Sequence, residues 1–338
     1  MLKIACLGAG YFSQFHFDAW NRVDGAEIVG VSNRDRAKAQ ATGLPVFETL
    51  EELLERTAPD VLDVIVSPEG HAEAITTALK HPLKAIICQK PFCRSIAEAR
   101  EMVTLARDAG IPLIIHENFR FQPWYRAIAK QIDRGAIGRV LQATFRLRPG
   151  DGQGPDAYLA RQPYFQKMER FLIHETGVHL VDTFRYLFGD PTDVYADLRR
   201  VNAVIAGEDA GYVMLDHPNG VRSIFDGNRC LDHEAHNTRC TMGEGLFEGT
   251  EGTLTLTGNG AVHLRKFGKT GGKTVLAADQ SPNFGGDCTY LLIAHVVDAL
   301  NGRTAFENTA ADYLTVMDVE EAIYRSSETQ SKLTLSPP

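Results

Sequence analysis

A glycine-rich turn stands near the start of the chain, between two apolar runs. Gly8-Ala9-Gly10-Tyr11-Phe12-Ser13 follows the apolar residues 3–7 and precedes a helix-like stretch and a second apolar run, residues 26–31. In a strand–turn–helix of this kind, backbone N–H groups and the helix N-terminus point at one place, where a pyrophosphate is stabilised. Ser13 replaces the commoner glycine or alanine and is still small. We predict a dinucleotide-binding turn with Gly8, Gly10, Tyr11 and Phe12 at the cofactor; a turn without a ligand is the alternative.

A lysine follows another apolar run. Lys90 comes after residues 85–88 and Gln89, at the expected carboxyl end of a strand, and Pro91 follows it. Open α/β sheets bind ligands at that edge, and a proline keeps the preceding residue out of helical geometry. A cation placed there could stabilise the alkoxide that develops when a secondary alcohol is oxidised. The alternative is an ordinary solvated lysine.

The end of the second apolar run bears on which nucleotide is bound. About twenty residues after such a turn, an acidic side chain normally binds the ribose of NAD. This chain has Ser32, Asn33 and Arg34 there, whose donor groups suit the 2′-phosphate of NADP. We therefore favour NADP over NAD, although Asp35 could bend back to a ribose and a solvated polar turn is the alternative.

The composition is that of a soluble globular chain with two cores. Its 338 residues are more than a domain with one hydrophobic core usually contains, and 44% of them are hydrophobic. The formal net charge of −8 argues against nucleic acid as a partner. No segment has the pattern of a membrane span or a signal peptide, so we expect no membrane partner. Six scattered cysteines fit free thiols in a reducing cytoplasm.

The order of apolar and amphipathic segments predicts two α/β domains. In residues 1–120, strands alternate with helices, which is typical of a Rossmann domain with a doubly wound parallel sheet. Residues 121–338 are expected to form an α/β domain with a large, mostly antiparallel open sheet, because longer alternating strands begin at residue 140. The expected strands are 61–66, 85–88, 113–115, 140–147, 193–201, 210–215, 221–226, 238–247 and 253–257. The expected helices are 69–80, 95–110, 123–133, 177–188, 287–300 and 310–326.

Three further motifs follow the glycine turn in order. They are Gln89-Lys90-Pro91, Asn118-Phe119-Arg120-Phe121 and Gly177-Val178-His179-Leu180-Val181-Asp182. Together they resemble the Gfo/Idh/MocA family, the relatives of glucose-fructose oxidoreductase and inositol dehydrogenase, over almost the whole chain. A narrower likeness, to sugar dehydrogenases of the family, lies in residues 89–92, 116–122 and 162–164.

The resemblance implies catalytic roles for Lys90, His179 and Glu175. In the family the lysine faces the nicotinamide, and the histidine acts as general base or proton relay. Gln89 stands where the family has a glutamate, and Glu175 where it has an aspartate. In a helix Glu175 would share a face with His179 and could orient it, and Asp182 is the other candidate. A helix histidine satisfied by a neighbour is the alternative.

The remaining candidates divide into a cofactor side and a substrate side. The family's loop under the cofactor corresponds to Ser67, Pro68 and His71, and Asn118 completes the cofactor set with Gln89 and Lys90. Substrate contacts are expected from Arg120, Trp124, Arg146, Arg148, Arg161, Gln162, Tyr164, Glu175 and His179. Arg120 could instead belong to a structural ion pair, and Trp124 to the core.

Two groups of possible metal ligands have the wrong spacing. His174 and His179 lie five residues apart, whereas the zinc motif places its histidines four apart. Cys230, His233, His236 and Cys240 match no common zinc signature. We predict no metal site.

The sequence thus predicts an NAD(P)-dependent dehydrogenase or reductase of CH–OH groups, acting on a sugar, polyol or sugar-derived acid. One alternative is an NAD-dependent glycoside hydrolase that oxidises its sugar transiently. The other is a non-catalytic nucleotide-binding sensor, suggested by Gln89 and Glu175. We also expect the exposed face of the second sheet to form a homodimer or homotetramer.

Overall fold

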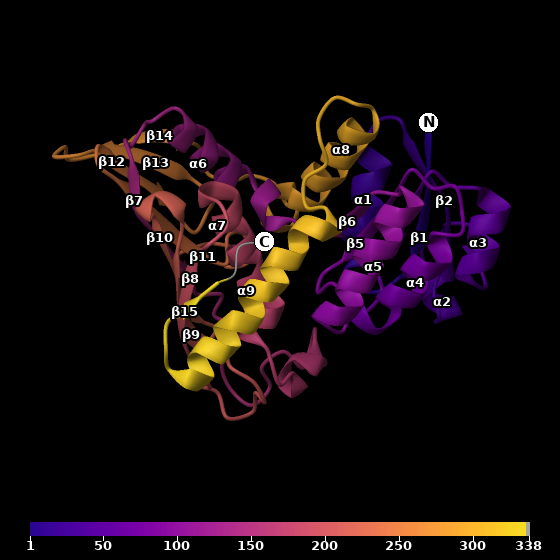
Figure 1. Ribbon diagram of the computed structural model, residues 1–338, viewed down its shortest axis with the longest axis horizontal. Helices are drawn as coiled ribbons and strands as arrows, with labels where there is room; N and C mark the ends of the chain where they lie inside the picture. The colour runs from indigo at the N-terminus through magenta and orange to yellow at the C-terminus, as the bar shows by residue number, and fades with distance from the viewer. Residues whose placement is uncertain (336–338) are drawn as a thin grey trace. The chain divides into compact units, whose positions relative to one another are not determined.

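The computed structural model describes residues 1–335, which form two compact units. The first contains Met1–Asn118 and Thr289–Leu314, and the second contains Phe119–Cys288 and the chain from Thr315 onward. Figure 1 labels most of the helices and strands of both units. Within residues 1–335, no helix combines the length and the apolar character that a membrane span requires. All six cysteines are free thiols, as predicted.

The first unit is built on a six-stranded parallel sheet in the order β3-β2-β1-β4-β5-β6. The strands are β1 (Leu2–Leu7), β2 (Ala26–Ser32), β3 (Val46–Phe47), β4 (Val61–Val64), β5 (Ala85–Gln89) and β6 (Leu113–His116). The strand order reverses between β1 and β4, which is where sheets of this type bind ligands. The predicted Rossmann fold is confirmed.

Helices follow the strands of this sheet as the sequence pattern requires. They are α1 (Ser13–Arg22), α2 (Arg36–Gln40), α3 (Leu50–Thr57), α4 (His71–Ala78) and α5 (Ile96–Ala109). The unit also contains α8 (Cys288–Leu300) from a later part of the chain, except for its first residue, which belongs to the second unit. The Ser95 hydroxyl caps α5 by accepting from the Glu98 N–H, and Gly110 ends the helix with a φ of 68°. The helix expected over 69–80 instead begins as a short 3-10 turn, Pro68–Gly70, before α4.

A distant segment closes the β6 edge of the first unit. The Ile115 N–H donates to the carbonyl of Asn308 at 2.8 Å, and Ile114 forms a β-bridge with Thr309. The Asn308 side chain also donates to the carbonyl of Glu117. Edge strands expose unpaired backbone groups, so this segment completes the sheet.

The second unit contains a nine-stranded sheet in the order β14-β13-β12-β11-β7-β10-β9-β8-β15. Its strands are β7 (Val140–Leu147), β8 (Asp193–Arg199), β9 (Ala210–Asp216), β10 (Arg222–Asn228), β11 (Gly243–Gly249), β12 (Gly252–Leu256), β13 (Val262–Lys266), β14 (Lys273–Leu276) and β15 (Leu333–Thr334). Only the pair of β7 and β10 is parallel among these described strands. The predicted, mostly antiparallel sheet is confirmed.

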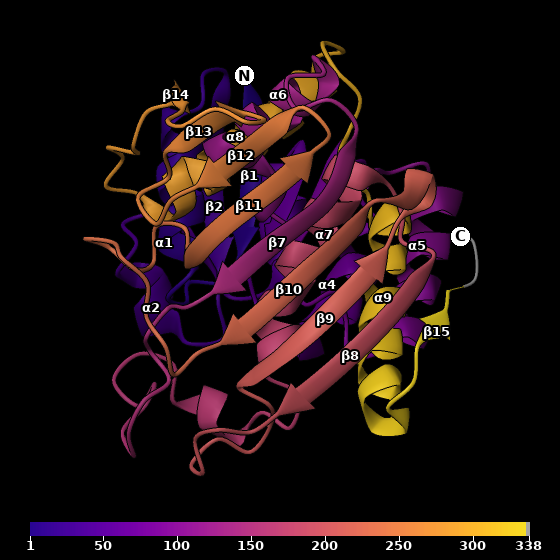
Figure 2. The same ribbon diagram turned by 90° about the vertical axis from the view of Figure 1, so that its left-hand side faces the viewer.

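Helices pack on one face of this sheet. They are α6 (Pro123–Asp133), α7 (Val178–Phe188) and the part of α9 (Ala310–Thr329) that belongs to the second unit. Figure 2 shows α7 and α9 behind the strands, and the Ser326 hydroxyl on α9 accepts from the Ala196 N–H on β8 at 3.0 Å. Side chains along β7 and β9 alternate between buried and more exposed positions, as expected when only one face meets a core.

Two local predictions need correction. The strand expected over 238–247 begins only at Gly243, because residues 237–242 form turns and Met242 has a φ of 60°. The helix expected from Gly177 is preceded by a π-helical turn, Leu172–Gly177, so Glu175 does not lie on α7 with His179. Glu175 and His179 therefore do not have the regular α-helical spacing that we assumed.

Candidate functional site

The glycine turn after β1 is shaped to admit a phosphate group. Gly8 has a φ of 115°, and a Cβ atom there would lie 2.5 Å from the carbonyl oxygen of Ile65, so only glycine fits. A Cβ on Gly10 would meet nothing within 4 Å. The buried Ser13 hydroxyl donates to the Gly10 carbonyl at 2.6 Å, and helix α1 begins without a side-chain cap. The open space at Gly10 and the uncapped helix start fit a bound pyrophosphate.

The end of β2 is tied to this turn. The side-chain carbonyl of Asn33 accepts from the Ala9 N–H at 3.0 Å, and Ser32 is buried. The Asp35 carboxylate caps α2 by accepting from two backbone N–H groups of that helix. Arg34 is exposed. The Asp35 carboxylate is thus engaged in capping, while Arg34 is exposed one residue after Asn33, which contacts the turn.

The loop after β4 also carries predicted cofactor residues. Pro68 opens the 3-10 turn, and a hydrogen bond from the Ser67 hydroxyl helps to lower the pKa of Glu69. His71 is fully buried, its Nε2 lies 2.9 Å from the Val66 carbonyl, and burial lowers the pKa of its imidazole. Asn118 follows β6, and its amide donates to the Thr289 hydroxyl at 3.5 Å. These residues lie on the first unit, at or beyond the carboxyl ends of β4 and β6.

Lys90 follows β5 at the carboxyl edge of the first sheet, as predicted. Gln89 precedes Lys90, and its side chain points into the interior. The residue is 8% exposed. Its Oε1 accepts from the Lys90 N–H at 3.1 Å. Its Nε2 lies 2.7 Å from Nε2 of His16 and 3.2 Å from Nδ1 of His116.

Sequence reasoning missed the buried network to which Gln89 belongs. Nδ1 of His16 lies 2.8 Å from Oδ2 of Asp63, and the Trp20 indole donates to the same oxygen at 2.7 Å. The rings of His16 and His116 lie 4.1 Å apart. One signal was available: Asp63 is an acid within the apolar run that forms β4, and a buried acid needs polar partners.

On the second unit, His179 lies on α7 and is 6% exposed. Its imidazole stacks on the Phe119 ring, with centroids 4.0 Å apart and an interplanar angle of 6°. Thr183 donates to the His179 carbonyl at 2.7 Å. Two of the motifs singled out in the sequence, those containing Phe119 and His179, are therefore in direct contact.

Arg120 and Asp182 form a buried ion pair in the second unit. Nε of Arg120 lies 2.8 Å from Oδ2 of Asp182, and a second guanidinium nitrogen binds Oδ1. The Asp182 side chain is fully buried, and that of Arg120 is 9% exposed. This geometry favours the structural alternative for Arg120 over a substrate contact. It also gives Asp182 a partner other than the His179 that it was predicted to orient.

Removing one charge of this pair should destabilise the protein. We expect Asp182→Asn to lower the free energy of unfolding by about 3 kcal/mol, because the buried Arg120 guanidinium group loses the carboxylate charge of Asp182. Urea denaturation measures the change. The control is Asp197→Asn, which removes an exposed partner of Arg199 and should leave stability nearly unchanged. Equal effects of the two substitutions would contradict the structural role of Asp182.

Glu175 is held by a cation that sequence reasoning did not find. Arg229 is 1% exposed; its Nη1 lies 3.5 Å from Oε2 of Glu175 and its Nη2 lies 2.9 Å from Oδ2 of Asp151. The Arg229 Nε donates to the Tyr158 hydroxyl at 2.8 Å. Burial disfavours the Arg229 charge, but Asp151 and the other anionic groups hold its pKa above the usual value. Glu175 therefore lies beside a permanent positive charge.

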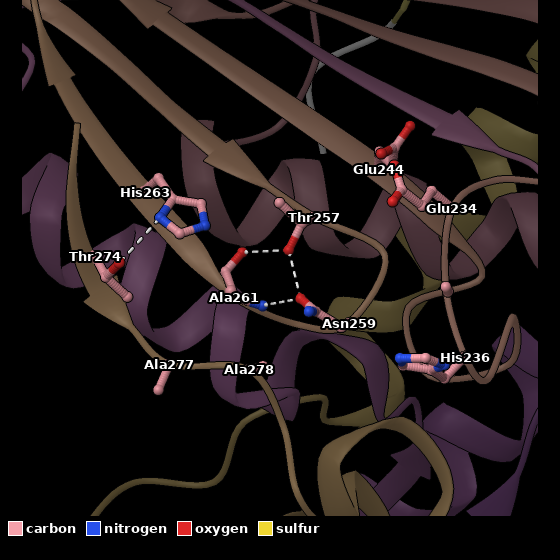
Figure 3. Close-up of a pocket in the computed structure, with 11 residues that line it drawn as sticks. Glu234, His236, Glu244, Thr257, Asn259, Ala261, His263, Thr274, Ala277 and Ala278 are labelled. Atoms are coloured by element: carbon pink, nitrogen blue, oxygen red, sulfur yellow. Dashed lines mark hydrogen bonds between the residues drawn. The ribbon is translucent and has the colours of Figure 1, made fainter. Parts of the chain in front are cut away.

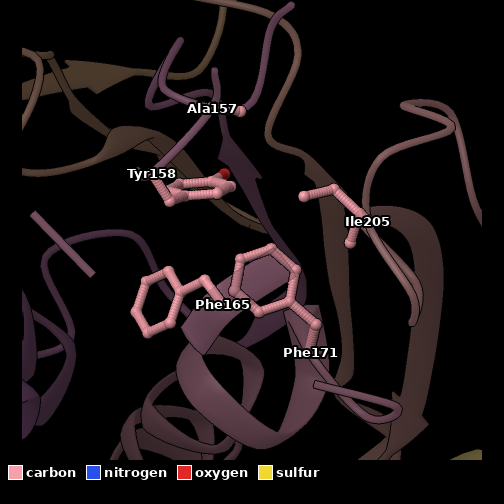
Figure 4. Packing of buried hydrophobic residues seen from close by; sticks show 5 residues of the cluster. All are labelled: Ala157, Tyr158, Phe165, Phe171 and Ile205. Atoms are coloured by element: carbon pink, nitrogen blue, oxygen red, sulfur yellow. The ribbon is translucent and has the colours of Figure 1, made fainter. Parts of the chain in front are cut away.

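Aromatic rings surround this guanidinium group. It lies over the rings of Tyr158, Phe165 and Phe171, at 5.2, 5.7 and 4.8 Å from their centroids. Figure 4 shows these three rings packed with Ala157 and Ile205 in one buried cluster. Cation–π contacts of a desolvated guanidinium group add to the ion pairs that fix Arg229.

The other predicted substrate residues occupy different environments. Trp124 is fully buried and belongs to the core. Arg148 is buried and pairs with Asp226 at 2.6 Å, whereas the Arg146 side chain is 57% exposed. Outside these core positions, Arg161 pairs with Asp151, Gln162 donates to the Tyr164 hydroxyl, and Tyr164 is exposed.

A cavity of about 680 Å³ lies beside β12 and β13 and contains none of the predicted substrate residues. Figure 3 shows its polar lining, which includes Glu234, His236, Glu244 and His263. The side chains of Thr257 and Asn259 bind each other at one side of the cavity. Across residues 1–335, no three His, Cys, Asp or Glu side chains are grouped to hold a metal ion.

The parallel sheet, its strand order and its glycine turn place the first unit among NAD-binding Rossmann domains. A family model described as an oxidoreductase family with an NAD-binding Rossmann fold matches residues 2–116. The model of the GFO/IDH/MocA C-terminal domain matches residues 125–255. The chain belongs to the GFO/IDH/MocA family of oxidoreductases, as its motifs predicted.

Named relatives support the same assignment. The chain is 35% identical over 283 residues to the D-apiose dehydrogenase of Paraburkholderia graminis, covering 82% of this chain and 72% of that protein. It is 30% identical over 341 residues to the D-apiose dehydrogenase of Rhizobium rhizogenes, covering 96% and 95% of the two chains. An oxidoreductase from Agrobacterium radiobacter, solved with NAD⁺, L-tartaric acid and magnesium, is 27% identical, with a TM-score of 0.88 over 98% of both chains.

Proposed function

We propose that this protein is an NAD(P)-dependent oxidoreductase that transfers a hydride between nicotinamide and a secondary alcohol or carbonyl of a sugar, polyol or sugar-derived acid. The glycine turn carries the proposal, because Gly10 faces open space beside the uncapped start of α1. The two D-apiose dehydrogenases, which align with most of this chain, support a substrate of the sugar class.

We assign the chemistry to Lys90, His179 and Glu175. When bound, the nicotinamide supplies the hydride acceptor or donor. The Lys90 ammonium group stabilises the substrate oxygen as it becomes an alkoxide. His179 takes the hydroxyl proton, in the orientation fixed by its stack on Phe119. Glu175, held beside Arg229, contributes a carboxylate whose position does not depend on α-helical spacing.

We propose NADP as the preferred cofactor. Arg34 is exposed at the end of β2, and the Asp35 carboxylate caps α2. A guanidinium group pairs with a 2′-phosphate by charge-assisted hydrogen bonds, whereas binding of a ribose 2′-hydroxyl normally uses a free carboxylate. The NAD⁺ bound to the Agrobacterium radiobacter relative is the competing choice.

We propose that the second unit, which holds most of the predicted domain 121–338, binds the substrate, and that the open face of its sheet joins copies of the chain into a homodimer or homotetramer. A mostly apolar row crosses that face by strand register: Tyr195 pairs with Met214, Met214 with Ile224, Ile224 with Thr144, and Thr144 with Leu246. Leu246 is exposed, and the other four residues are half-buried. Apolar side chains that reach solvent together on one face are typical of protein interfaces.

A sugar panel tests the function. The purified protein is incubated with NAD or NADP and a series of sugars, polyols and sugar acids, and the absorbance of reduced nicotinamide is followed. We expect the cofactor to be reduced with at least one substrate, and to be reduced faster when it is NADP. In Arg34→Ala, the preference for NADP over NAD should be about tenfold smaller, because a charge-assisted hydrogen bond is lost. Tight cofactor binding without any turnover would support the sensor, and glycoside cleavage without net reduction would support the hydrolase.

A further inference from the structure

We propose that Gln89 is a positioning residue that fixes the backbone at Lys90 and holds His16 and His116 in defined neutral forms. The proposal rests on the proposed catalytic function of Lys90. Gln89, His16, His116 and Asp63 come from four elements of the first unit, namely β5, α1, β6 and β4. Each of these four residues is at most 8% exposed.

The orientation of the Gln89 amide follows from its contact with Lys90. The Lys90 N–H can only donate, so the Gln89 atom 3.1 Å away is the carbonyl oxygen, Oε1. The other end of the amide is therefore the NH₂ group, which carries two hydrogens. It faces one ring nitrogen of each histidine, at 2.7 Å for His16 and 3.2 Å for His116. Both ring nitrogens must accept a hydrogen bond.

This requirement assigns the proton on each ring. A neutral imidazole has one N–H and one acceptor nitrogen. Because Nε2 of His16 accepts from Gln89, the His16 proton is on Nδ1, and because Nδ1 of His116 accepts, the His116 proton is on Nε2. Asp63 gives an independent check, since its carboxylate lies 2.8 Å from Nδ1 of His16 and needs a hydrogen there.

Two buried thiols, those of Cys6 and Cys88, are among the ionisable groups near Asp63. Burial, with the Asp63 charge as a second cause, raises the pKa of the Cys6 thiol, and it also raises the pKa of Cys88. Glu117 follows His116 and accepts from the Tyr313 hydroxyl at 3.4 Å. The network therefore places Oδ2 of Asp63 against the Nδ1–H group of His16, inside the unit.

A glutamate at position 89 would change this arrangement. An ionised carboxylate has no hydrogen to donate, so both ring nitrogens would have to become donors. His16 must keep its Nδ1 proton for Asp63, and would therefore become an imidazolium between two buried carboxylates. Loss of that proton at higher pH would leave two buried negative charges side by side. The amide of Gln89 keeps the segment before Lys90 free of this titration.

The first experiment measures the histidines directly. The protein is labelled with ¹⁵N-histidine, and two-bond ¹H–¹⁵N correlation spectra are recorded with and without cofactor, with His16→Asn and His116→Asn used for assignment. We expect the Nδ1–H form of His16 and the Nε2–H form of His116, both with and without cofactor. A charged ring or a reversed proton position at either histidine would overturn the proposal.

The second experiment uses Gln89→Glu, with the exposed Gln40→Glu as control. We expect an imidazolium signal at His16 in Gln89→Glu but not in Gln40→Glu or the wild type. The Tm of Gln89→Glu should lie about 5 °C below that of the wild type at neutral pH. The folded state of the variant binds the His16 proton more tightly than the unfolded state does. The resulting stabilisation is present at low pH and is lost as pH rises, so the Tm deficit should grow with pH.

The activity of Gln89→Glu completes the test. Its pH–kcat profile should gain an ionisation that the wild type and Gln40→Glu lack, with kcat falling about tenfold across it. Unchanged histidine spectra and an unchanged profile would overturn the role of Gln89. Failure of the wild type to oxidise any substrate would instead contradict the proposed function, while the wild-type spectra would still decide the protonation of His16 and His116.

Discussion

Lys90→Met should lower kcat by about 10³-fold while the protein still binds its cofactor. Methionine keeps much of the length of lysine but has no ammonium group to stabilise the substrate oxygen in the transition state, an effect of this size in other active sites. Steady-state kinetics on the best substrate of the panel measures the loss, and a fluorescence titration measures cofactor binding.

The matched control for this variant is Lys80→Met. Lys80 is an exposed lysine of the same unit, in the turn after α4. It should tolerate methionine with little change in turnover, because an exposed side chain away from the sheet edge contributes little to stability or chemistry. A Lys90→Met variant that bound cofactor and kept full turnover would remove Lys90 from the mechanism.

His179→Asn should lower kcat by about 10²- to 10⁴-fold, the usual contribution of a general base. Asparagine can still form hydrogen bonds but cannot exchange a proton near neutral pH. The wild-type rate should rise with pH as the base loses its proton, and this rise should be absent in the variant. Comparing the pH–kcat profiles of the two proteins therefore separates loss of the base from a change in packing against Phe119.

His236→Asn provides the control for the second variant. His236 is an exposed histidine of the same unit and lines the cavity beside β12 and β13. Its substitution should leave both kcat and the shape of the pH profile unchanged. If His179→Asn behaved like His236→Asn, the alternative of a histidine that only packs on Phe119 would be favoured.

The sequence predicted those parts of the fold that depend on local pattern. Residues 123–133 and 140–147 form α6 and β7 with the predicted bounds, because proline at a helix start and alternation along a strand are local signals. The short strands β13 to β15 were missed. Most of their residues are polar or exposed, and they join the sheet through pairing with their neighbours rather than through an apolar run of their own.

The candidate site was predictable only where motifs mark it. The turn at Gly8, the lysine after β5 and the histidine of α7 each stand in a recognisable context. In contrast, Arg229 meets Glu175 and Asp151 across wide gaps in sequence, and His16 meets Gln89 across 73 residues. The π-helical turn that carries Glu175 also has no clear sequence signal. Contacts of this kind depend on the assembled fold.

The segment that closes the β6 edge has a consequence for how the first unit is made. When residues 1–118 have been synthesised, all six strands of the first sheet are present. Asn308 and Thr309, which pair with β6, have not yet been made. Until about 190 more residues are synthesised, that edge remains open to other strands and so to aggregation. A fragment that ends near residue 120 would keep this open edge permanently, so the nucleotide-binding unit should be produced as part of the whole chain.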